Sequence, residues 1–234
     1  MKKPFLFAAL DREDFGEVVE LAQELSSCEG EFGFKLNLDF FVNSRKDSHY
    51  FNKISRLKRP IFADLKMWNG ERTMSHIARD LANRGVNYLN VYAHALEPFI
   101  NGVVKAVEET GTDAKVLGLT VLTHYTEEDC QKLYGCSMRD AVRRLAKISY
   151  SAGVYGIIVP GTALESVKDL PIEKLVTAIR PKWYGKSGEN HQKQEVYPQE
   201  AIKNGANLIV CGTPIIKSAD RKLALQKTLE EMST

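Results

Sequence analysis

The chain has 234 residues, 44% of them apolar and 26% charged, which is enough to bury one sizeable hydrophobic core. Its 32 basic and 30 acidic residues leave a formal charge of +2, so no overall field would draw it to nucleic acid or to a membrane surface. The apolar run at residues 5–10 is too short for a signal peptide, and no stretch approaches the ~20 apolar residues that span a bilayer. We therefore expect a cytoplasmic protein without nucleic-acid or membrane partners.

The chemistry-bearing cysteines and histidines form no recognisable metal motif. Cys28, Cys130, Cys136 and Cys211 stand singly, without a C-x-x-C pair. Disulfides and a cysteine-built metal site are therefore not expected, and the thiols should be reduced and partly buried. No histidine spacing indicates a metal ligand set either. We expect neither a metal nor a cofactor.

Short apolar runs alternate with longer amphipathic stretches along the whole chain, a pattern typical of a parallel sheet covered by helices. In chain order, the predicted strands are residues 5–10, 32–36, 61–65, 88–92, 116–122, 156–159, 175–179 and 208–211. Helical patterns lie at residues 18–25, 74–83, 99–109, 138–152, 198–203 and 221–232. Eight strands favour a closed barrel over an open doubly wound sheet, which commonly has roughly five or six. The predicted fold class is α/β, a (β/α)8 TIM barrel forming a single domain over residues 1–234.

The longest polar stretch, residues 182–193, follows the seventh predicted strand and contains three lysines and two glycines. Loops after barrel strands build the active site, so this stretch could be a mobile loop over the catalytic face. A disordered surface segment would have the same composition, and both interpretations stay open.

The end of the third predicted strand combines two opposite charges. Positions two apart in a strand face the same side, so Asp64 and Lys66 should both point into the barrel while Leu65 packs outward. Lys35, at the end of the second strand, and Asp11, after the first, should converge on the same barrel mouth. Each charge alone could be an ordinary rim salt bridge. Together they indicate a functional site, because clustered charges at a barrel mouth are costly unless they are paired.

Further candidates follow the later strands. Gly212 and Thr213 come directly after the eighth strand, where glycine lets backbone N–H groups approach an anion and barrels often hold phosphate. A small apolar turn into a helix would look similar. His94 and His124 follow the fourth and fifth strands and could face the site, although a satisfied or solvated histidine is the default expectation.

The segment FADLKMWNGERT, from Phe62 to Thr73, resembles the D-x-K-x-x-D motif of the orotidine 5′-monophosphate decarboxylase family, with Thr73 where that motif continues to a threonine. The resemblance extends over nearly the whole chain. Further similar segments are Leu10-Asp11, Gly33-Phe34-Lys35, Thr120-Val121-Leu122-Thr123, Ile179-Arg180-Pro181, His191-Gln192-Lys193-Gln194 and Asn207 to Ile215.

This resemblance implies metal-free and cofactor-free decarboxylation of orotidine 5′-monophosphate to uridine 5′-monophosphate, a step of pyrimidine biosynthesis, in a homodimer. It implies that Asp64 crowds the substrate carboxylate, that Lys66 is the proton donor, and that Lys35 binds ribose and orients Asp64. Asn69 occupies the position of the motif's second carboxylate, which the partner subunit supplies. The implied substrate-binding residues are Asp11, Thr73, Thr123, His124, Gln192, Gly212 and Thr213.

Three of the departures from the family pattern fall on candidate site residues. Asn69 stands in place of an aspartate, His124 in place of a serine, and Thr213 in place of a phosphate-binding arginine. Two alternatives therefore stay open. The chain could be a divergent lyase or isomerase of the same superfamily that acts on another nucleotide or sugar phosphate, or a non-catalytic protein that binds a phosphorylated ligand.

Overall fold

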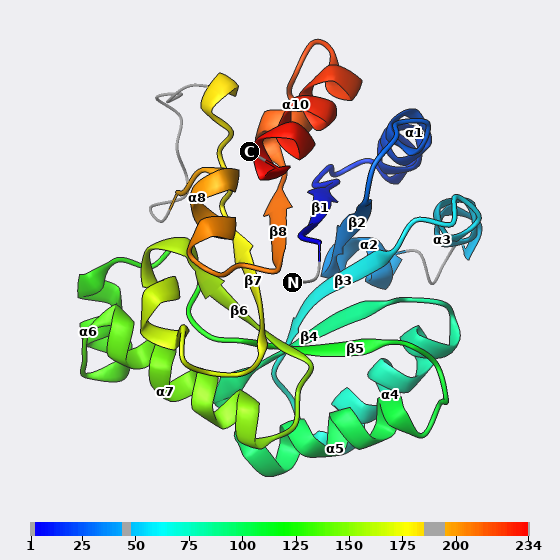
Figure 1. Cartoon of the computed structure of the whole chain (residues 1–234). Coiled ribbons are helices and arrows are strands. Elements are labelled where there is room, and N and C mark those ends of the chain that lie inside the picture. The colour runs from blue at the N-terminus through cyan, green and yellow to red at the C-terminus, as the bar shows by residue number, and fades with distance from the viewer. Residues whose placement is uncertain (1–2, 44–47, 185–194, 234) are drawn as a thin grey trace.

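Eight parallel strands close into a barrel in which neighbours in sequence are neighbours in the sheet, and β8 pairs with β1 (Figure 1). The computed structural model describes residues 3–43, 48–184 and 195–233. The strands are β1 Phe5–Ala9, β2 Phe32–Asn37, β3 Ile61–Met67, β4 Tyr88–Tyr92, β5 Lys115–Leu119, β6 Gly156–Pro160, β7 Glu173–Thr177 and β8 Leu208–Cys211. The prediction of an α/β barrel of eight strands is confirmed.

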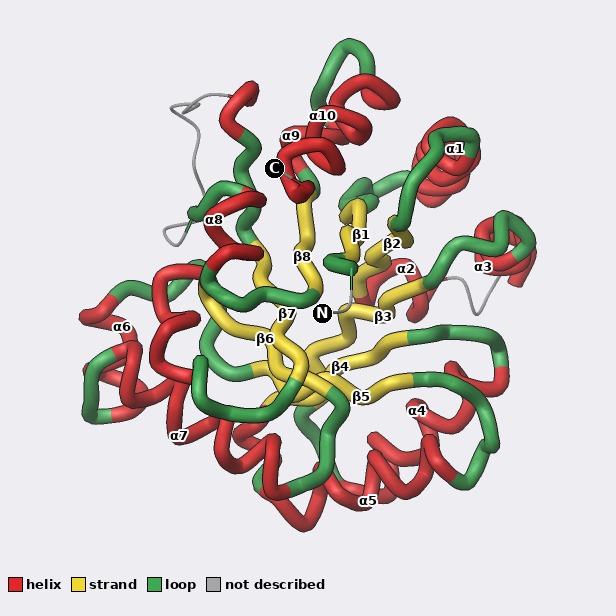
Figure 2. The backbone as a smooth tube through the Cα atoms, viewed as in Figure 1, coloured by secondary structure: helices red, strands yellow, loops and turns green. Residues whose placement is uncertain are grey.

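Helices surround this sheet on its outer side, as Figure 2 shows. The α-helices are α1 Phe15–Ser26, α2 Leu38–Asn43, α3 Ser48–Ser55, α4 Glu71–Asn83, α5 Glu97–Glu108, α6 Glu127–Tyr134, α7 Met138–Ser151, α8 Pro198–Lys203, α9 Thr213–Ile216 and α10 Arg221–Ser233. Short 3-10 helices are η1 Ala93–Ala95, η2 Gly161–Val167 and η3 Lys182–Tyr184. Among the described residues, no helix is both long and apolar enough to cross a bilayer.

Local backbone chemistry explains where elements differ from the sequence prediction. The seventh strand covers Glu173–Thr177 instead of residues 175–179, because Ala178 has a φ of 61°, which is incompatible with an extended strand. The connection from β6 to β7 is the 3-10 helix η2 rather than an α-helix. Helix α6 was not predicted, although Thr126 and Asp129 form a reciprocal capping box at its start, a signal readable in sequence.

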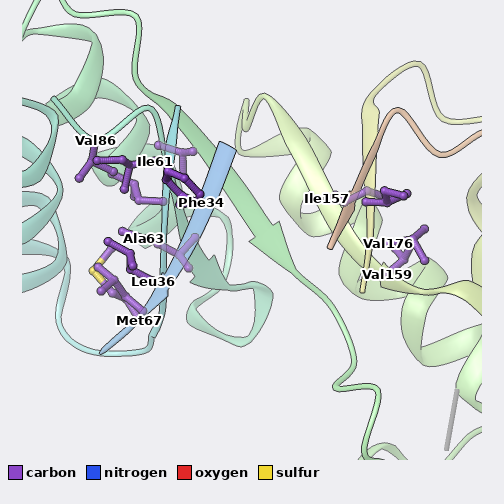
Figure 3. Packing of buried hydrophobic residues seen from close by; sticks show 14 of the residues in the cluster. Phe34, Leu36, Ile61, Ala63, Met67, Val86, Ile157, Val159 and Val176 are labelled. Carbon is purple, nitrogen blue, oxygen red and sulfur yellow. The ribbon is translucent and has the colours of Figure 1, made fainter. Parts of the chain in front are cut away.

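Two separate apolar layers hold the barrel together. The larger lies between the sheet and the helices, and Figure 3 shows Phe34, Leu36, Ile61, Ala63 and Met67 within it. The smaller fills the barrel interior with Phe7, Ala9, Phe62, Leu117, Leu119, Ile158, Leu175, Leu208 and Val210. Residues of one strand therefore alternate between the two layers, as the twofold side-chain period requires.

The alternation sets which side chains reach the mouth of the barrel. Along β3, Ile61, Ala63 and Leu65 belong to the outer layer, whereas Phe62 belongs to the interior. The next inward positions are Asp64 and Lys66, and both line a cavity at the carboxyl ends of the strands. The apolar filling thus ends one layer below the mouth, and charged residues replace it there.

Candidate active site

Lys35 is the most buried charged residue of the site and the centre of a hydrogen-bond cluster. It is 5% exposed, and its Nζ lies 2.9 Å from Oδ1 of Asp11 and 3.3 Å from Oδ2 of Asp64. It also donates to Oδ1 of Asn37, the last residue of β2. Burial by itself lowers the pKa of Lys35, but the charges and hydrogen bonds of the two carboxylates outweigh it, so the net pKa is raised. Lys35 is therefore a fixed cation.

Asp64 lies between the two lysines. Its Oδ2 is 2.7 Å from Nζ of Lys66 and also contacts Lys35, and its Oδ1 accepts a hydrogen bond of 2.7 Å from Nδ2 of Asn90. Burial alone would raise the pKa of Asp64, but the two ammonium groups and their hydrogen bonds, with Asn90, bring it below the ordinary value. A negative charge is thereby held beside a half-exposed ammonium at the cavity wall.

The backbone at Lys66 departs from regular strand geometry. Lys66 has a φ of 50°, the left-handed region, and the pairing of β3 with β4 shifts register between Ala63 and Met67. The backbone N–H of Lys66 donates to Oδ1 of Asn90 at 2.7 Å instead of to a strand carbonyl. Such bulges are common beside active sites, where they redirect a side chain.

The opposite wall of the cavity comes from β5 to β8. Thr123 and His124 follow β5 and line the cavity together with Arg180, Gly212 and Thr213. The cavity volume is about 240 Å³. It is therefore lined by carboxylates and lysines on one side, and by threonine hydroxyls, an imidazole and a guanidinium on the other.

Arg180, which belongs to the segment Ile179-Arg180-Pro181 noted in the sequence, lines the cavity as a further cation. Its Nε lies 3.1 Å from Oε1 of Glu195, and its Nη1 donates to the carbonyl oxygen of Ile179. Gly212 also lines the cavity, next to β1. A Cβ added to it would be 3.2 Å from Cβ of Ala9 and 3.9 Å from Oδ2 of Asp11. A side chain at position 212 would narrow the cavity between β8 and β1.

The structure brings most sequence-predicted site residues into one cavity. Asp11, Lys35, Asp64, Lys66, Thr123, His124, Gly212 and Thr213 all line it. Asn69 and Thr73 do not line it in the single chain: Asn69 is exposed and accepts from the N–H of Gly70. The predicted residue Gln192 lies outside the described residues, as does most of the predicted loop 182–193.

His94, the other histidine considered from sequence, lies away from the cavity lining. Its ring stacks on Tyr134 at a centroid distance of 5.4 Å and lies 5.7 Å from the rings of Trp68 and Tyr92. Burial, and then the charge of Arg144, lower its pKa. This histidine is part of an aromatic cluster beside the mouth.

Sequence reasoning missed Asn90, because it considered only residues at or beyond strand ends. Asn90 is fully buried in the middle of β4, on the face directed into the barrel, with Tyr88 and Tyr92 two positions on either side. A buried amide inside an apolar strand needs hydrogen-bond partners, so its position could have indicated polar neighbours. Within the described chain, no group of three or more His, Cys, Asp or Glu side chains is arranged to hold a metal ion.

The fold and the cavity define a class of protein: an eight-stranded α/β barrel with a lysine and aspartate network at the carboxyl ends of its first three strands. Residues 4–228 match the model of the orotidine 5′-phosphate decarboxylase / HUMPS family, and the chain belongs to that family.

Individual relatives agree with this assignment. The chain is 29% identical to the orotidine 5′-phosphate decarboxylase of Nautilia profundicola over 231 residues, which cover 97% of this chain and 98% of that protein. It is 35% identical to the enzyme of the same name from Caulobacter sp. over 179 residues, 75% of each chain. The crystal structure of orotidine 5′-phosphate decarboxylase from Lactobacillus acidophilus superposes with a TM-score of 0.81 at 23% identity, covering 100% of both chains.

Proposed function

We propose that this chain decarboxylates orotidine 5′-phosphate to uridine 5′-phosphate in pyrimidine biosynthesis, with Lys66 as the proton donor and without a metal or cofactor. Family membership and the names of the curated relatives support the reaction. The observation that carries the assignment of roles is the contact of 2.7 Å between Nζ of Lys66 and Oδ2 of Asp64 at the cavity wall. At this place in the cavity wall, Asp64 supplies a negative charge and the Lys66 ammonium supplies a proton.

The proposed chemistry follows from these two charges. A substrate carboxylate beside ionised Asp64 is repelled, and this repulsion is relieved when the carbon–carbon bond breaks and carbon dioxide leaves. The electron pair stays on the ring carbon, where the Lys66 ammonium stabilises the negative charge and then transfers a proton to that carbon. Lys66 regains the proton from water. The lowered pKa of Asp64 suits this role, because the carboxylate stays ionised.

The remaining cavity residues suit the other parts of a nucleotide. Lys35 and Asp11 offer a donor and an acceptor for ribose hydroxyls, and their mutual contact of 2.9 Å orients both. Thr123 and His124 face them across the cavity and are assigned to the base. We assign the phosphate to Gly212 and Thr213 with Gln192, and Arg180 supplies the cation that the sequence lacks at position 213.

We further propose a homodimer in which Asn69 and Thr73 of one subunit complete the site of the other. Large apolar side chains are exposed beside this loop: Trp68 is 68% exposed, and Leu96 is 55% exposed. A shared interface on this side would cover them. Sedimentation velocity of the wild type should give twice the chain mass, and Trp68→Asp should give a monomer with reduced turnover. A fully active monomer would contradict the arrangement.

The expected compartment is the cytoplasm. All four cysteines are free thiols in the structure, which suits a reducing environment. Differential extraction of cells that express the protein, followed by immunodetection, tests this location.

A second candidate is a related lyase or isomerase for another phosphorylated carbonyl compound, and the neutral side chain of Asn69 favours it. The lost carboxylate removes one charge that the family motif places near the substrate. On this hypothesis, orotidine 5′-phosphate would not react, while a phosphorylated ligand would still raise the melting temperature.

The deciding experiment is the loss of ultraviolet absorbance when purified protein is mixed with orotidine 5′-phosphate. Lys66→Ala should abolish turnover, whereas Lys132→Ala, which removes an exposed lysine on α6, should leave it unchanged. Both variants should keep the wild-type circular dichroism spectrum. No absorbance change at high concentrations of the wild type would refute the proposed reaction and direct the search to other phosphorylated substrates.

A further inference from the structure

Asn90 lies below the cavity and connects two residues of the proposed machinery without contacting the cavity itself. Its side chain donates from Nδ2 to Oδ1 of Asp64 and accepts at Oδ1 from the backbone N–H of Lys66, each at 2.7 Å. It is 0% exposed and is absent from the cavity lining. The nitrogen and the oxygen of one amide therefore bond Asp64 and Lys66, the two residues to which we assign the chemistry.

The strand register explains why this amide is needed. Ala63 pairs with Leu89, and Met67 pairs with Val91, so the single residue Asn90 lies opposite three residues of β3. The ladder cannot supply regular backbone partners across such a bulge. The Asn90 side chain bonds the Lys66 N–H in place of a strand carbonyl, at the position where Lys66 has a φ of 50°.

The other contacts of Asp64 show what the amide adds. Both ammonium groups lie on Oδ2, Lys66 at 2.7 Å and Lys35 at 3.3 Å, whereas Asn90 bonds Oδ1. Without Asn90 the carboxylate could rotate about its side-chain bonds, because the long lysine side chains can follow it. The amide fixes the rotation, and the same amide fixes the main chain from which Lys66 projects.

We propose that Asn90 is a positioning residue that holds the Asp64 carboxylate and the Lys66 main chain in the one arrangement in which the two can act on a substrate. This inference rests on the proposed function for its kinetic consequences, but the contacts themselves are independent of it. Asn90 does not touch the substrate. It acts by holding the Lys66 main chain and the Asp64 carboxylate in fixed relative positions across the bulge.

The test compares three variants. Asn90→Leu removes both hydrogen bonds at similar volume, next to Leu117 on β5, which fills the barrel interior. Asn90→Asp keeps an acceptor for Lys66 but loses the donor to Asp64. Asn87→Leu is the matched control, because Asn87 also accepts a backbone N–H of β3, that of Ile61 at 2.9 Å, but at the opposite end of the strand.

We expect Asn90→Leu to lower kcat roughly tenfold to a hundredfold with KM changed by less than about threefold, because transition-state positioning is lost while binding groups remain. Asn90→Asp should be at least as impaired, since it places a second carboxylate against Asp64. Asn87→Leu should keep wild-type kcat and lose only stability. Equal kcat losses in Asn87→Leu and Asn90→Leu, in proportion to their stability, would overturn the positioning role.

A second readout does not depend on turnover. The groups that face the Asp64 carboxylate are Lys35 and Lys66, with Asp11 beyond Lys35 and the Tyr92 hydroxyl farther away. All of them stay in Asn90→Leu, so removal of the amide should raise the pKa of Asp64, measured as an upward shift of its titration by carboxyl-carbon NMR. The control Asn87→Leu should titrate like the wild type.

The two readouts separate the possible failures. If the wild type does not decarboxylate orotidine 5′-phosphate, the proposed function fails, while the NMR titration still tests the Asn90 contact. An Asp64 titration that is identical in the wild type and in Asn90→Leu would refute the inference even if the enzyme is active.

Discussion

Replacing Lys35 with methionine should lower the free energy of unfolding mainly through its effect on Asp64. Lys35 is 5% exposed and its ammonium has carboxylate oxygens of Asp11 and Asp64 within 3.3 Å. Methionine preserves most of the side-chain volume but removes the positive charge. Asp64, whose side chain is 12% exposed, is then left with one ammonium instead of two.

The magnitude follows from the geometry of this pair. At an effective dielectric constant of about 20, charges 3.3 Å apart attract by about 5 kcal/mol. Part of this energy offsets desolvation, and Lys66 remains 2.7 Å from the same oxygen, so we expect a coupling of about 2–3 kcal/mol between Lys35 and Asp64.

The pH dependence has a definite sign. The folded-state pKa of Asp64 is lowered, so its stabilising contribution is complete above the ordinary aspartate value and is lost as the pH falls through the lowered one. The pKa of Lys35 is raised, so its contribution is lost only as the pH rises through that higher value. The stability difference between the wild type and Lys35→Met should therefore be largest near neutral pH and should narrow in strong acid.

Urea unfolding followed by circular dichroism measures this coupling in a double-mutant cycle of Lys35→Met and Asp64→Asn. The control cycle uses Arg79 and Glu109, a pair with a similar contact of 2.8 Å whose side chains are 43% and 66% exposed, for which we expect less than about 1 kcal/mol. The reasoning is refuted if the Lys35 and Asp64 effects add within about 0.5 kcal/mol at pH 7.

Two further predictions concern the barrel wall and the thiols. Gly33→Ala should prevent native folding or lower the free energy of unfolding by several kcal/mol, because the added Cβ would lie 2.3 Å from the carbonyl oxygen of Pro60. Thermal unfolding followed by circular dichroism measures this loss, and a wild-type melting temperature would contradict the clash. A thiol reagent should modify one cysteine in the native protein, Cys136, because the other three are buried and burial raises the pKa of Cys130 to about 11 and of Cys211 to about 12. Mass spectrometry after alkylation should show one added group, and none in Cys136→Ser.

The sequence predicted the strands well because each is a short, largely apolar run between polar segments. The fourth strand at residues 88–92 and the eighth at residues 208–211 agree with β4 and β8 at both ends. The short helices α2 and α3 were not predicted, because helices of six and eight residues carry too few turns to give a clear period. The end of β7 depends on the left-handed backbone of Ala178. Alanine rarely adopts this conformation, so the residue type does not indicate it.

The charged part of the site was predictable from the twofold period of a strand, which places Asp64 and Lys66 on one face and Leu65 on the other. The same rule would have found Asn90, had interior strand positions been examined as well as strand ends. The bulge at Lys66 could not have been predicted, because it depends on how β3 and β4 pair across the barrel. Asn69 is exposed and Thr73 is partly exposed in one chain, and only their positions, at the end of the motif and shortly after it, indicate a role.

The pairing of β8 with β1 determines when the cavity can form during synthesis. Asp11 follows the first strand and Gly212 the last, yet the two lie on either side of one narrow gap, since Phe5 pairs with Leu208 and Ala8 with Cys211. A nascent chain that has left the ribosome as far as β7 has all the lysines of the cavity but an open seam between its first and seventh strands. Ligand binding can therefore report the completion of the barrel, and an arrested chain that ends before residue 208 should not bind nucleotide.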